Sequence, residues 1–426
     1  MNQEQKQKQS PLFVIFTTVL IDLIGFGMVI PLIGLYGRHY GASALQLSIL
    51  GGIYSLMQFF FSPFWGALSD RIGRRPVLLI SLFGSTLSYI LFGLAPNYTW
   101  LLLARAVGGG FAANISTAQA YIADVTPPKD RAKGMGLIGA AFGIGFTLGP
   151  PLGGIASAHL GLSAPGLIAA LICGSNLLIA LFRLPESLPL EKRQKTHGST
   201  LGSHRSLSPL DFTRLMETFR HPQLALLMLT FFSVTFAFSM MEQTFSLLFQ
   251  TKFALDTGEA GLKTGLVLMV SGILGAVVQG GLIRRLAPRF GERKLLLSGI
   301  FINIFAMGLF PFSPNFTFYF LLAIPIALGS SLVNPSLSAL ISKNASAQEQ
   351  GSTLGISQGL SSLARATGPF LGLLSFGVSP ELPYLFASCI SLILFLLCLR
   401  GVQTPETEVQ IPLESRAYAE KSAETT

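Results

Sequence analysis

Charged residues are scarce in this chain. Of its 426 residues, 12% are Asp, Glu, Lys or Arg, whereas an average soluble domain has about 25%. Another 50% are apolar, and the mean hydropathy is +0.59. The apolar residues form blocks of roughly 20, the length with which an α-helix crosses the hydrocarbon core of a bilayer. The scarcity of charge therefore excludes a soluble protein and predicts an integral membrane protein.

Cysteines and cofactor signatures are scarce as well. The three cysteines (173, 389 and 398) lie inside apolar blocks, and no CxxC pair or Cys/His cluster is present, which argues against a disulfide framework and a zinc site. No P-loop occurs, and none of the five histidines falls in the middle of an apolar block. We therefore expect no metal, no cofactor and no enzymatic activity. The net charge of +9 comes from no single dense tract, so a nucleic-acid partner is not expected.

The apolar blocks predict an all-α integral membrane protein with twelve spanning helices. The spans lie near Leu12–Leu35, Leu45–Leu68, Val77–Leu94, Tyr98–Ile122, Gly134–Ala158, Ser163–Leu184, Leu224–Phe249, Gly261–Ile283, Leu295–Phe312, Phe316–Ile341, Thr353–Phe376 and Leu382–Leu399. They divide the chain into a polar N-terminal segment (1–11), a six-helix half (12–184), a central loop (185–221), a second six-helix half (222–400) and a polar tail (401–426). No small-residue cleavage site follows a short apolar core, so we read the first span as retained rather than as a signal peptide.

Lys and Arg are distributed unevenly between the two sides of this topology. With the N-terminus in the cytoplasm, 24 of the 29 basic residues lie in cytoplasmic segments, three lie outside, and Arg105 and Arg365 fall within spans. Because basic loops stay in the cytoplasm, both termini are predicted to be cytoplasmic. We expect a multi-pass protein of a bacterial-type cytoplasmic (inner) membrane, with acidic lipid headgroups among its contacts.

The two halves resemble each other at a spacing of about 219 residues. Pro96-Asn97-Tyr-Thr recurs as Pro314-Asn315-Phe-Thr, and Gly149-Pro150 recurs as Gly368-Pro369. A duplication of six helices is how many secondary transporters are built, with the substrate site near the bilayer midplane where the halves meet. Rocking of one half on the other then gives alternating access.

The loop between the second and third spans combines charge with glycine. Asp70 can hold arginine side chains or the positive end of a neighbouring helix, and glycines allow close approach and a tight reversal of the chain. We interpret the loop as a conformational latch on the cytoplasmic side; a loop that only marks topology would need neither Asp70 nor the glycines. The predicted latch residues are Gly66, Asp70, Arg71, Gly73, Arg74 and Arg75, with Asp124 and Arg131 at the next cytoplasmic loop.

The fifth span is rich in glycine. Glycines recur at four-residue spacings and offer small faces for close helix contact, while Pro150 removes one backbone hydrogen bond and bends the helix. We predict that this helix seals the outer mouth at the interface of the halves. The motif comprises Gly145, Gly149, Pro150, Gly153 and Gly154.

These motifs together resemble the major facilitator superfamily. The loop motif from Gly66 to Arg75 is similar to the conserved loop of that superfamily. Leu101-x-x-x-Arg105-x-x-Gly108 is similar to its second motif, although Gly108 stands where the family often has Gln. The motif of the fifth span resembles that of the exporting, proton-antiporting branch.

Further motifs resemble twelve-span drug/proton antiporters, and among them tetracycline/proton exporters. These are Asp22-x-x-Gly25-x-Gly27-Met28-x-x-Pro31 in the first span and Leu184-Pro185-Glu186-Ser187 after the sixth. Ser88, however, stands where those exporters carry an acidic residue, so tetracycline itself is less favoured as the substrate.

Charged residues inside the spans are functional candidates by default. Asp22 lies near the middle of the first span and Glu242 in the seventh. The repeat puts Glu242 one position from the counterpart of Asp22, whereas counting from His221 places it nearer the outer end. Burial of a carboxyl group favours its protonated form, so both suit proton coupling, with Arg105 as an alternating partner. Each could instead make a structural polar contact, and Arg365 is either a gate or a structural pair.

An apolar surface is predicted beside these charges. Aromatic side chains and flexible methionines suit lipophilic or amphiphilic ligands, although each alone could also face lipid or pack in the core. The predicted cavity residues are Phe26, Gln58, Phe236, Met240, Met241, Gln243 and Phe245.

The sequence thus predicts a monomeric secondary transporter whose partners are a small-molecule substrate and protons. Export of a hydrophobic or amphiphilic compound in exchange for protons fits the motif of the fifth span and the apolar surface. The alternatives are uptake or facilitated diffusion of a metabolite on the same fold, and a membrane receptor or scaffold without transport, which would not need the charges inside the spans.

Overall fold

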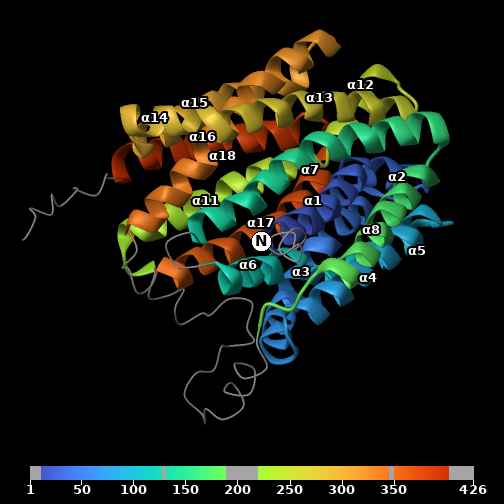
Figure 1. Cartoon of the computed structure of the whole chain (residues 1–426). Coiled ribbons are helices and arrows are strands. Elements are labelled where there is room, and N and C mark those ends of the chain that lie inside the picture. Colours follow the sequence, from blue (N-terminus) through green and yellow to red (C-terminus); the bar gives the residue numbers. More distant parts are fainter. Residues whose placement is uncertain (1–10, 127–130, 189–218, 345–349, 403–426) are drawn as a thin grey trace, which may run out of the picture.

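The computed structural model describes residues 11–126, 131–188, 219–344 and 350–402 and contains helices but no strand in these ranges (Figure 1). The first half comprises α1 (Pro11–Val29), η2 (Ile30–Leu32), α2 (Ile33–His39), α3 (Ala44–Ile72), α4 (Arg74–Gly93), α5 (Tyr98–Gly110), α6 (Asn114–Val125), α7 (Arg131–Leu160) and α8 (Ser163–Arg183). The second comprises α11 (Pro222–Glu242), α12 (Phe245–Phe253), α13 (Thr257–Val277), η4 (Val278–Leu282), α14 (Ile283–Phe290), α15 (Glu292–Leu309), η5 (Phe310–Phe312), α16 (Phe316–Asn344), α17 (Gln350–Phe376) and α18 (Leu382–Gly401).

Ten helical stretches of the described residues are long and apolar enough to cross a membrane. Two predicted spans are not among them. The predicted eleventh span lies on α17, which carries Arg365 and several small polar residues. The predicted fourth span, Tyr98–Ile122, is divided into α5 and α6. The total of twelve spans and the cytoplasmic position of the termini stay predictions.

The division between α5 and α6 has a local cause. Three consecutive glycines end α5, and glycine is the weakest helix former after proline. Ser81 of α4 then satisfies the interrupted backbone: its hydroxyl donates to the carbonyl of Phe111 and accepts the N–H of Ala113. Packing against α4 therefore stabilises the break.

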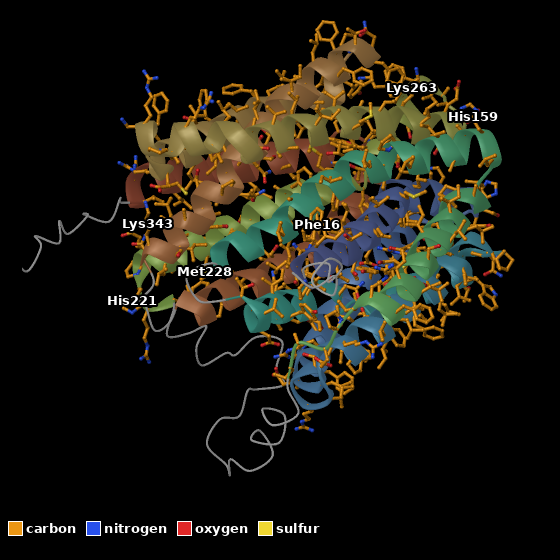
Figure 2. The ribbon with its side chains drawn as sticks, in the orientation of Figure 1. Phe16, His159, His221, Met228, Lys263 and Lys343 are labelled. Atoms are coloured by element: carbon orange, nitrogen blue, oxygen red, sulfur yellow. The ribbon has the colours of Figure 1, made fainter. Side chains whose placement is uncertain are left out.

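The bundle has two ends that Figure 2 makes visible. His159 and Lys263 lie at one end, and His221 and Lys343 lie at the opposite one. We call these the His159 end and the His221 end. The sequence predicts that the His221 end faces the cytoplasm.

The internal repeat recurs in the hydrogen bonds of the two halves. The side chain of Asn97 caps α5 by accepting the N–H of Trp100, and Asn315 accepts the N–H of Phe318 at the start of α16 in the same way. At the His221 end, Arg75 donates to the carbonyl of Leu181 over 2.7 Å, and Arg293 donates to that of Leu399 over 2.9 Å. The repeated residues thus fix equivalent helix ends.

The Gly-rich helix α7 contacts both halves. On one face it meets α1, where a Cβ atom at Gly153 would lie only 2.1 Å from the carbonyl oxygen of Met28. On another face it meets α13, and the contact between α7 and α13 is the most extensive between any two described helices (Figure 1). A Cβ atom at Gly154 would lie 2.6 Å from the carbonyl oxygen of Gly261. Only glycine permits this approach of the backbones.

Two further contacts join the halves toward the His159 end. A Cβ atom at Gly52 of α3 would lie 2.7 Å from the carbonyl oxygen of Ala366 in α17. The guanidinium of Arg38 in α2 donates to Gln250 Oε1 over 3.3 Å and to Thr251 Oγ1 over 2.9 Å in α12. The His159 end is therefore closed by contacts between the halves.

The same helices separate toward the His221 end. Along α7, the face toward α13 runs through Gly154 and Thr147, and a Cβ atom at Gly272 of α13 would lie 2.4 Å from Thr147 Oγ1. One turn further along, a Cβ atom at Gly143 would meet no atom within 4 Å. The halves thus diverge from the middle of the bundle toward the His221 end.

We predict that Gly153→Ala lowers the free energy of unfolding by about 1–3 kcal/mol, because the added methyl group overpacks the contact with α1. Denaturant unfolding of the purified protein in detergent measures this. Gly139→Ala is the matched control on the same helix, since its Cβ atom would meet nothing within 4 Å. A Gly153→Ala protein as stable as the control would contradict the close packing.

Cysteine cross-linking tests the divergence of α7 and α13. A Cβ atom at Gly258 would lie 2.9 Å from the Cα atom of Ala158, which brings the pair Ala158→Cys/Gly258→Cys within reach of a disulfide. We expect this pair to cross-link on oxidation, as measured by mass spectrometry of the linked peptides. Gly143→Cys/Ala276→Cys, on the same two helices nearer the His221 end, should stay reduced. Equal cross-linking of both pairs would disprove the divergence.

Candidate functional site

Asp22 lies near the middle of α1 and is half-buried. Three helices of the same half bring polar side chains within hydrogen-bonding reach of its carboxyl group: Asn114 from α6, Ser85 from α4 and Cys173 from α8. The sulfur of Cys173 lies 3.7 Å from Asp22 Oδ1. The carboxyl group therefore has polar neighbours on several sides and can be held in place in either protonation state.

Arg105 is buried in the same half. It is 3% exposed, and its guanidinium lies 4.4 Å from the centre of the Tyr54 ring, a cation–π arrangement. Close packing of α5 on α3 makes this contact, because a Cβ atom at Gly109 would lie 2.2 Å from the carbonyl oxygen of Tyr54. Among the described residues, the Nε atom of Arg105 has no hydrogen-bond partner and no carboxylate pairs with the guanidinium.

Glu242 is the last residue of α11, where the seventh predicted span is interrupted before α12. It is half-buried and interacts electrostatically with Arg365 of α17. The guanidinium of Arg365 donates to Ser361 Oγ over 2.6 Å and to Ser362 Oγ over 3.3 Å. A second carboxyl group thus lies near a second arginine, this time within the second half.

The depth of Glu242 follows from equivalent contacts. A Cβ atom at Gly153 would lie 2.1 Å from the carbonyl oxygen of Met28, and one at Gly372, its counterpart in the repeat, 2.2 Å from that of Met240. Met240 is therefore the counterpart of Met28, and Glu242 lies eight residues beyond the counterpart of Asp22, about 12 Å nearer the His159 end. The spacing of 219 residues between the repeats therefore does not apply to α11. Glu242 lies nearer the outer end of the seventh predicted span, as the count from His221 indicates.

Tyr54 of α3 connects the charges of the two halves. Its hydroxyl group interacts electrostatically with Asp22 and Arg105 of its own half and with Arg365 of the other. Its ring lies 5.1 Å from that of Phe26. The sequence reading missed this residue, and the available signal was a hydroxyl-bearing aromatic residue inside an apolar span.

The predicted cavity residues divide into two groups. Phe26, Gln58 and Phe236 are half-buried. The other four are buried in this conformation: Met240, Met241, Gln243 and Phe245. Phe245 stacks on Phe310 with ring centres 4.7 Å apart, and Gln243 donates to the carbonyl oxygen of Gly51 across the interface of the halves. The first group lies beside Tyr54 and α17, whereas the second stabilises the closed His159 end.

At the His221 end, Arg74 is the centre of the charged cluster that the loop motif predicts. It is 8% exposed and forms ion pairs with Asp70 at 2.6 Å and Asp124 at 3.0 Å. Glu186 accepts the backbone N–H groups of Arg74 and Arg75 at the start of α4. Gly73, with φ of 108°, makes the reversal before α4. The sequence motif after the sixth span contains Glu186, but it does not predict that this residue caps α4.

The other predicted latch residues that the structure describes make fewer contacts than Arg74. Arg71 is exposed, and a Cβ atom at Gly66 would meet nothing within 4 Å. The side chain of Arg131 lies outside the described part of the chain. Within the described residues, no three His, Cys, Asp or Glu side chains come together as a candidate metal site.

Known proteins share the sequence and the fold. Residues 15–290 and 282–424 match the sequence profile of the Major Facilitator Superfamily. Tetracycline resistance protein, class C, of Escherichia coli is 33% identical over 401 residues, which cover 93% of this chain and 97% of that protein. Multidrug resistance protein 2 of Bacillus subtilis is 27% identical and covers 92% and 95%.

A solved structure is similar over the whole bundle. The crystal structure of the human organic anion transporter MFSD10 (TETRAN) superposes with a TM-score of 0.68 at 27% identity, covering 93% of this chain and all of the other. The resemblance predicted from the motifs is thereby confirmed, as is the expectation that the protein is not an enzyme. The chain belongs to the major facilitator superfamily of membrane transporters.

Proposed function

We propose that this transporter exports a hydrophobic or amphiphilic small molecule in exchange for protons. One observation carries the proposal above the others: two carboxyl groups, Asp22 and Glu242, are half-buried inside the helix bundle, one in each half. Ionisable residues at such positions are costly and typically serve transport. The sequence similarity to tetracycline and multidrug resistance proteins supports the substrate class.

Proton coupling rests on the environment of the two carboxyl groups. Burial favours the protonated form, and a nearby guanidinium favours the ionised form. Glu242 is within electrostatic range of Arg365, whereas the guanidinium of Arg105 is stacked on Tyr54 and leaves Asp22 without a cation partner among the described residues. A movement that brings Arg105 to Asp22, or takes Arg365 from Glu242, changes the proton affinity of each site. Such a change couples conformation to proton uptake and release.

Alternating access follows from the interface of the halves. The proposed halves, residues 12–184 and 222–400, meet at the His159 end and diverge toward the His221 end, which we assign to the cytoplasm. Substrate then enters from the cytoplasm or the inner leaflet and binds between Phe26, Tyr54 and Phe236. Rocking of the halves about the contacts of α7 and α3 opens the opposite side, as in other secondary transporters.

We assign the Arg74 cluster to the latch. Its ion pairs to Asp70 and Asp124 and the cap by Glu186 join four segments of the first half at the His221 end. Closure of that end requires this half to move as one rigid body, and the cluster provides the rigidity. Uptake of a metabolite on the same fold remains the alternative, and the direction of transport distinguishes the two.

Neutralising the carboxyl groups tests the coupling. In proteoliposomes with an imposed pH gradient, we expect Glu242→Gln and Asp22→Asn to abolish uphill accumulation of a lipophilic dye, because neither side chain can then carry a proton. Downhill exchange of the same dye should persist, since the amides keep the shape of the site.

The matched control is Glu259→Gln, which removes an acid from the first turn of α13 at the His159 end. It should leave both dye accumulation and exchange unchanged. If the Glu242→Gln/Asp22→Asn double variant still released protons when the dye is transported, the assignment of proton coupling to these two residues would be wrong. Dye accumulation on the His221 side under an inward proton gradient would instead establish uptake.

A second substrate class, organic anions, is favoured by the unpaired state of Arg105. Its guanidinium has no carboxylate partner among the described residues, and buried arginines normally have one. The similarity to an organic anion transporter supports this class. An amphiphile with an acidic group would supply the missing partner and lay its apolar body against the neighbouring aromatic rings.

A matched pair of ligands tests this class: a lipophilic carboxylate dye and its methyl ester. We expect Arg105→Lys to weaken binding of the carboxylate about tenfold, because lysine loses the bidentate hydrogen bonds of the guanidinium. Binding of the ester should change little. Equilibrium dialysis of the purified protein measures both. Equal effects on the two ligands would exclude a role of Arg105 in binding an anion.

A further inference from the structure

A groove on the outside of the first half is not used by the transport mechanism. It lies between the start of α1 and the end of α8 and has a volume of about 470 Å³, within the range of about 300–1,000 Å³ typical of small-molecule sites. Apolar side chains, among them Phe13, Leu178 and Phe182, make most of its wall. These three are exposed, Phe182 to 81%.

The groove has a polar base and a charged mouth. At its deep end, Asn176 is 1% exposed and donates from Nδ2 to the carbonyl oxygen of Thr18 over 2.8 Å, which ties α8 to α1. At its shallow end, Arg183 is the last residue of α8 and is exposed at the His221 end. Seven residues of helix, about 10 Å, separate the two. No carboxylate of the described residues pairs with Arg183.

At the corresponding helix end of the second half, α18 packs closely on α11. Arg400 is the next-to-last residue of α18, and Arg183 is the last residue of α8. Near the end of α18, Cys398 is fully buried, with its sulfur 3.3 Å from the hydroxyl oxygen of Thr230 in α11. Val402 is also fully buried, and a Cβ atom at Gly401 would lie 2.5 Å from Leu226 Cδ2.

We propose that this groove binds an anionic membrane phospholipid, with its phosphate on Arg183 and the upper part of one acyl chain between α1 and α8. In a membrane-spanning bundle the apolar wall of this groove faces the acyl chains of the lipids, and the guanidinium of Arg183 lies at the depth of the headgroups. The excess of Lys and Arg at this end predicts the cytoplasmic leaflet, which is the anionic one in many membranes. Charge and shape therefore select the same ligand.

Lipid binding to the full-length protein in detergent tests the proposal. Native mass spectrometry during titration with phosphatidylglycerol or phosphatidylcholine gives the ratio of the two affinities. We expect Arg183→Gln to lower the preference for phosphatidylglycerol about fivefold, the effect of one cation near a lipid surface. Arg183→Lys should keep the preference. Arg400→Gln removes the same charge from the corresponding end of α18 and should also keep it.

The acyl-chain part of the groove has its own test. Leu178→Trp fills the wall and should weaken binding of both lipids. Leu171→Trp alters another exposed leucine of α8, outside the groove, and should leave the binding of both lipids unchanged. An equal loss of preference in Arg183→Gln and Arg400→Gln would reduce the effect to general surface charge and overturn the site. Unchanged lipid binding in Leu178→Trp would also overturn it.

Discussion

Close contact of helix backbones at glycine is the constraint on which this bundle depends. Lipid tails are as apolar as leucine, so helices in a membrane gain little by burying apolar side chains against each other. Contact must come from van der Waals packing and interhelical hydrogen bonds. Helix α7 concentrates this packing, because its glycines meet α1 on one face and α13 on another. One helix therefore holds the first half together and also joins it to the second.

The same constraint explains how the halves can move. An interface of small residues has no interlocking side chains, so its two faces can slide or tilt at low cost. Near the His159 end the backbones of α7 and α13 touch, and one turn beyond Thr147 they no longer do. Asp22 lies in the middle of α1 beside this divergence, and Tyr54 is within electrostatic range of arginines from both halves. A tilt of the halves therefore alters the distances between these groups.

Much of this arrangement could be predicted from the sequence, because hydropathy and glycine spacing report directly on helices in a membrane. The Gly-Pro motif of α7, the Asn caps and the ion pair of Asp70 with Arg74 follow from local chemistry. What the sequence did not reveal depends on contacts between distant segments. Tyr54 is recognisable only once α5 lies against α3. Likewise, the break between α5 and α6 depends on a hydroxyl group of α4, and no local pattern encodes it.

The repeat is most informative where the halves differ. At the His221 end, Arg74 pairs with Asp124 in the first half, and Glu292 pairs with Lys343 at 2.5 Å in the second, with the charges exchanged between equivalent positions. An ion pair can exchange its signs and keep its geometry, so the two halves share this contact although the residues differ.

The carboxyl groups inside the bundle do not follow that rule. Asp22 and Glu242 differ by about two helical turns in depth, about 12 Å, although both lie on equivalent helices. If the two acids had equivalent structural roles, we would expect them at the same depth in both halves, as is the case for the ion pairs at the His221 end. In the exchange for protons that we propose, two acids at different depths divide the path of a proton into shorter steps, which one pair of equivalent sites would not do. The departure from symmetry therefore argues for separate roles of the two carboxyl groups in transport.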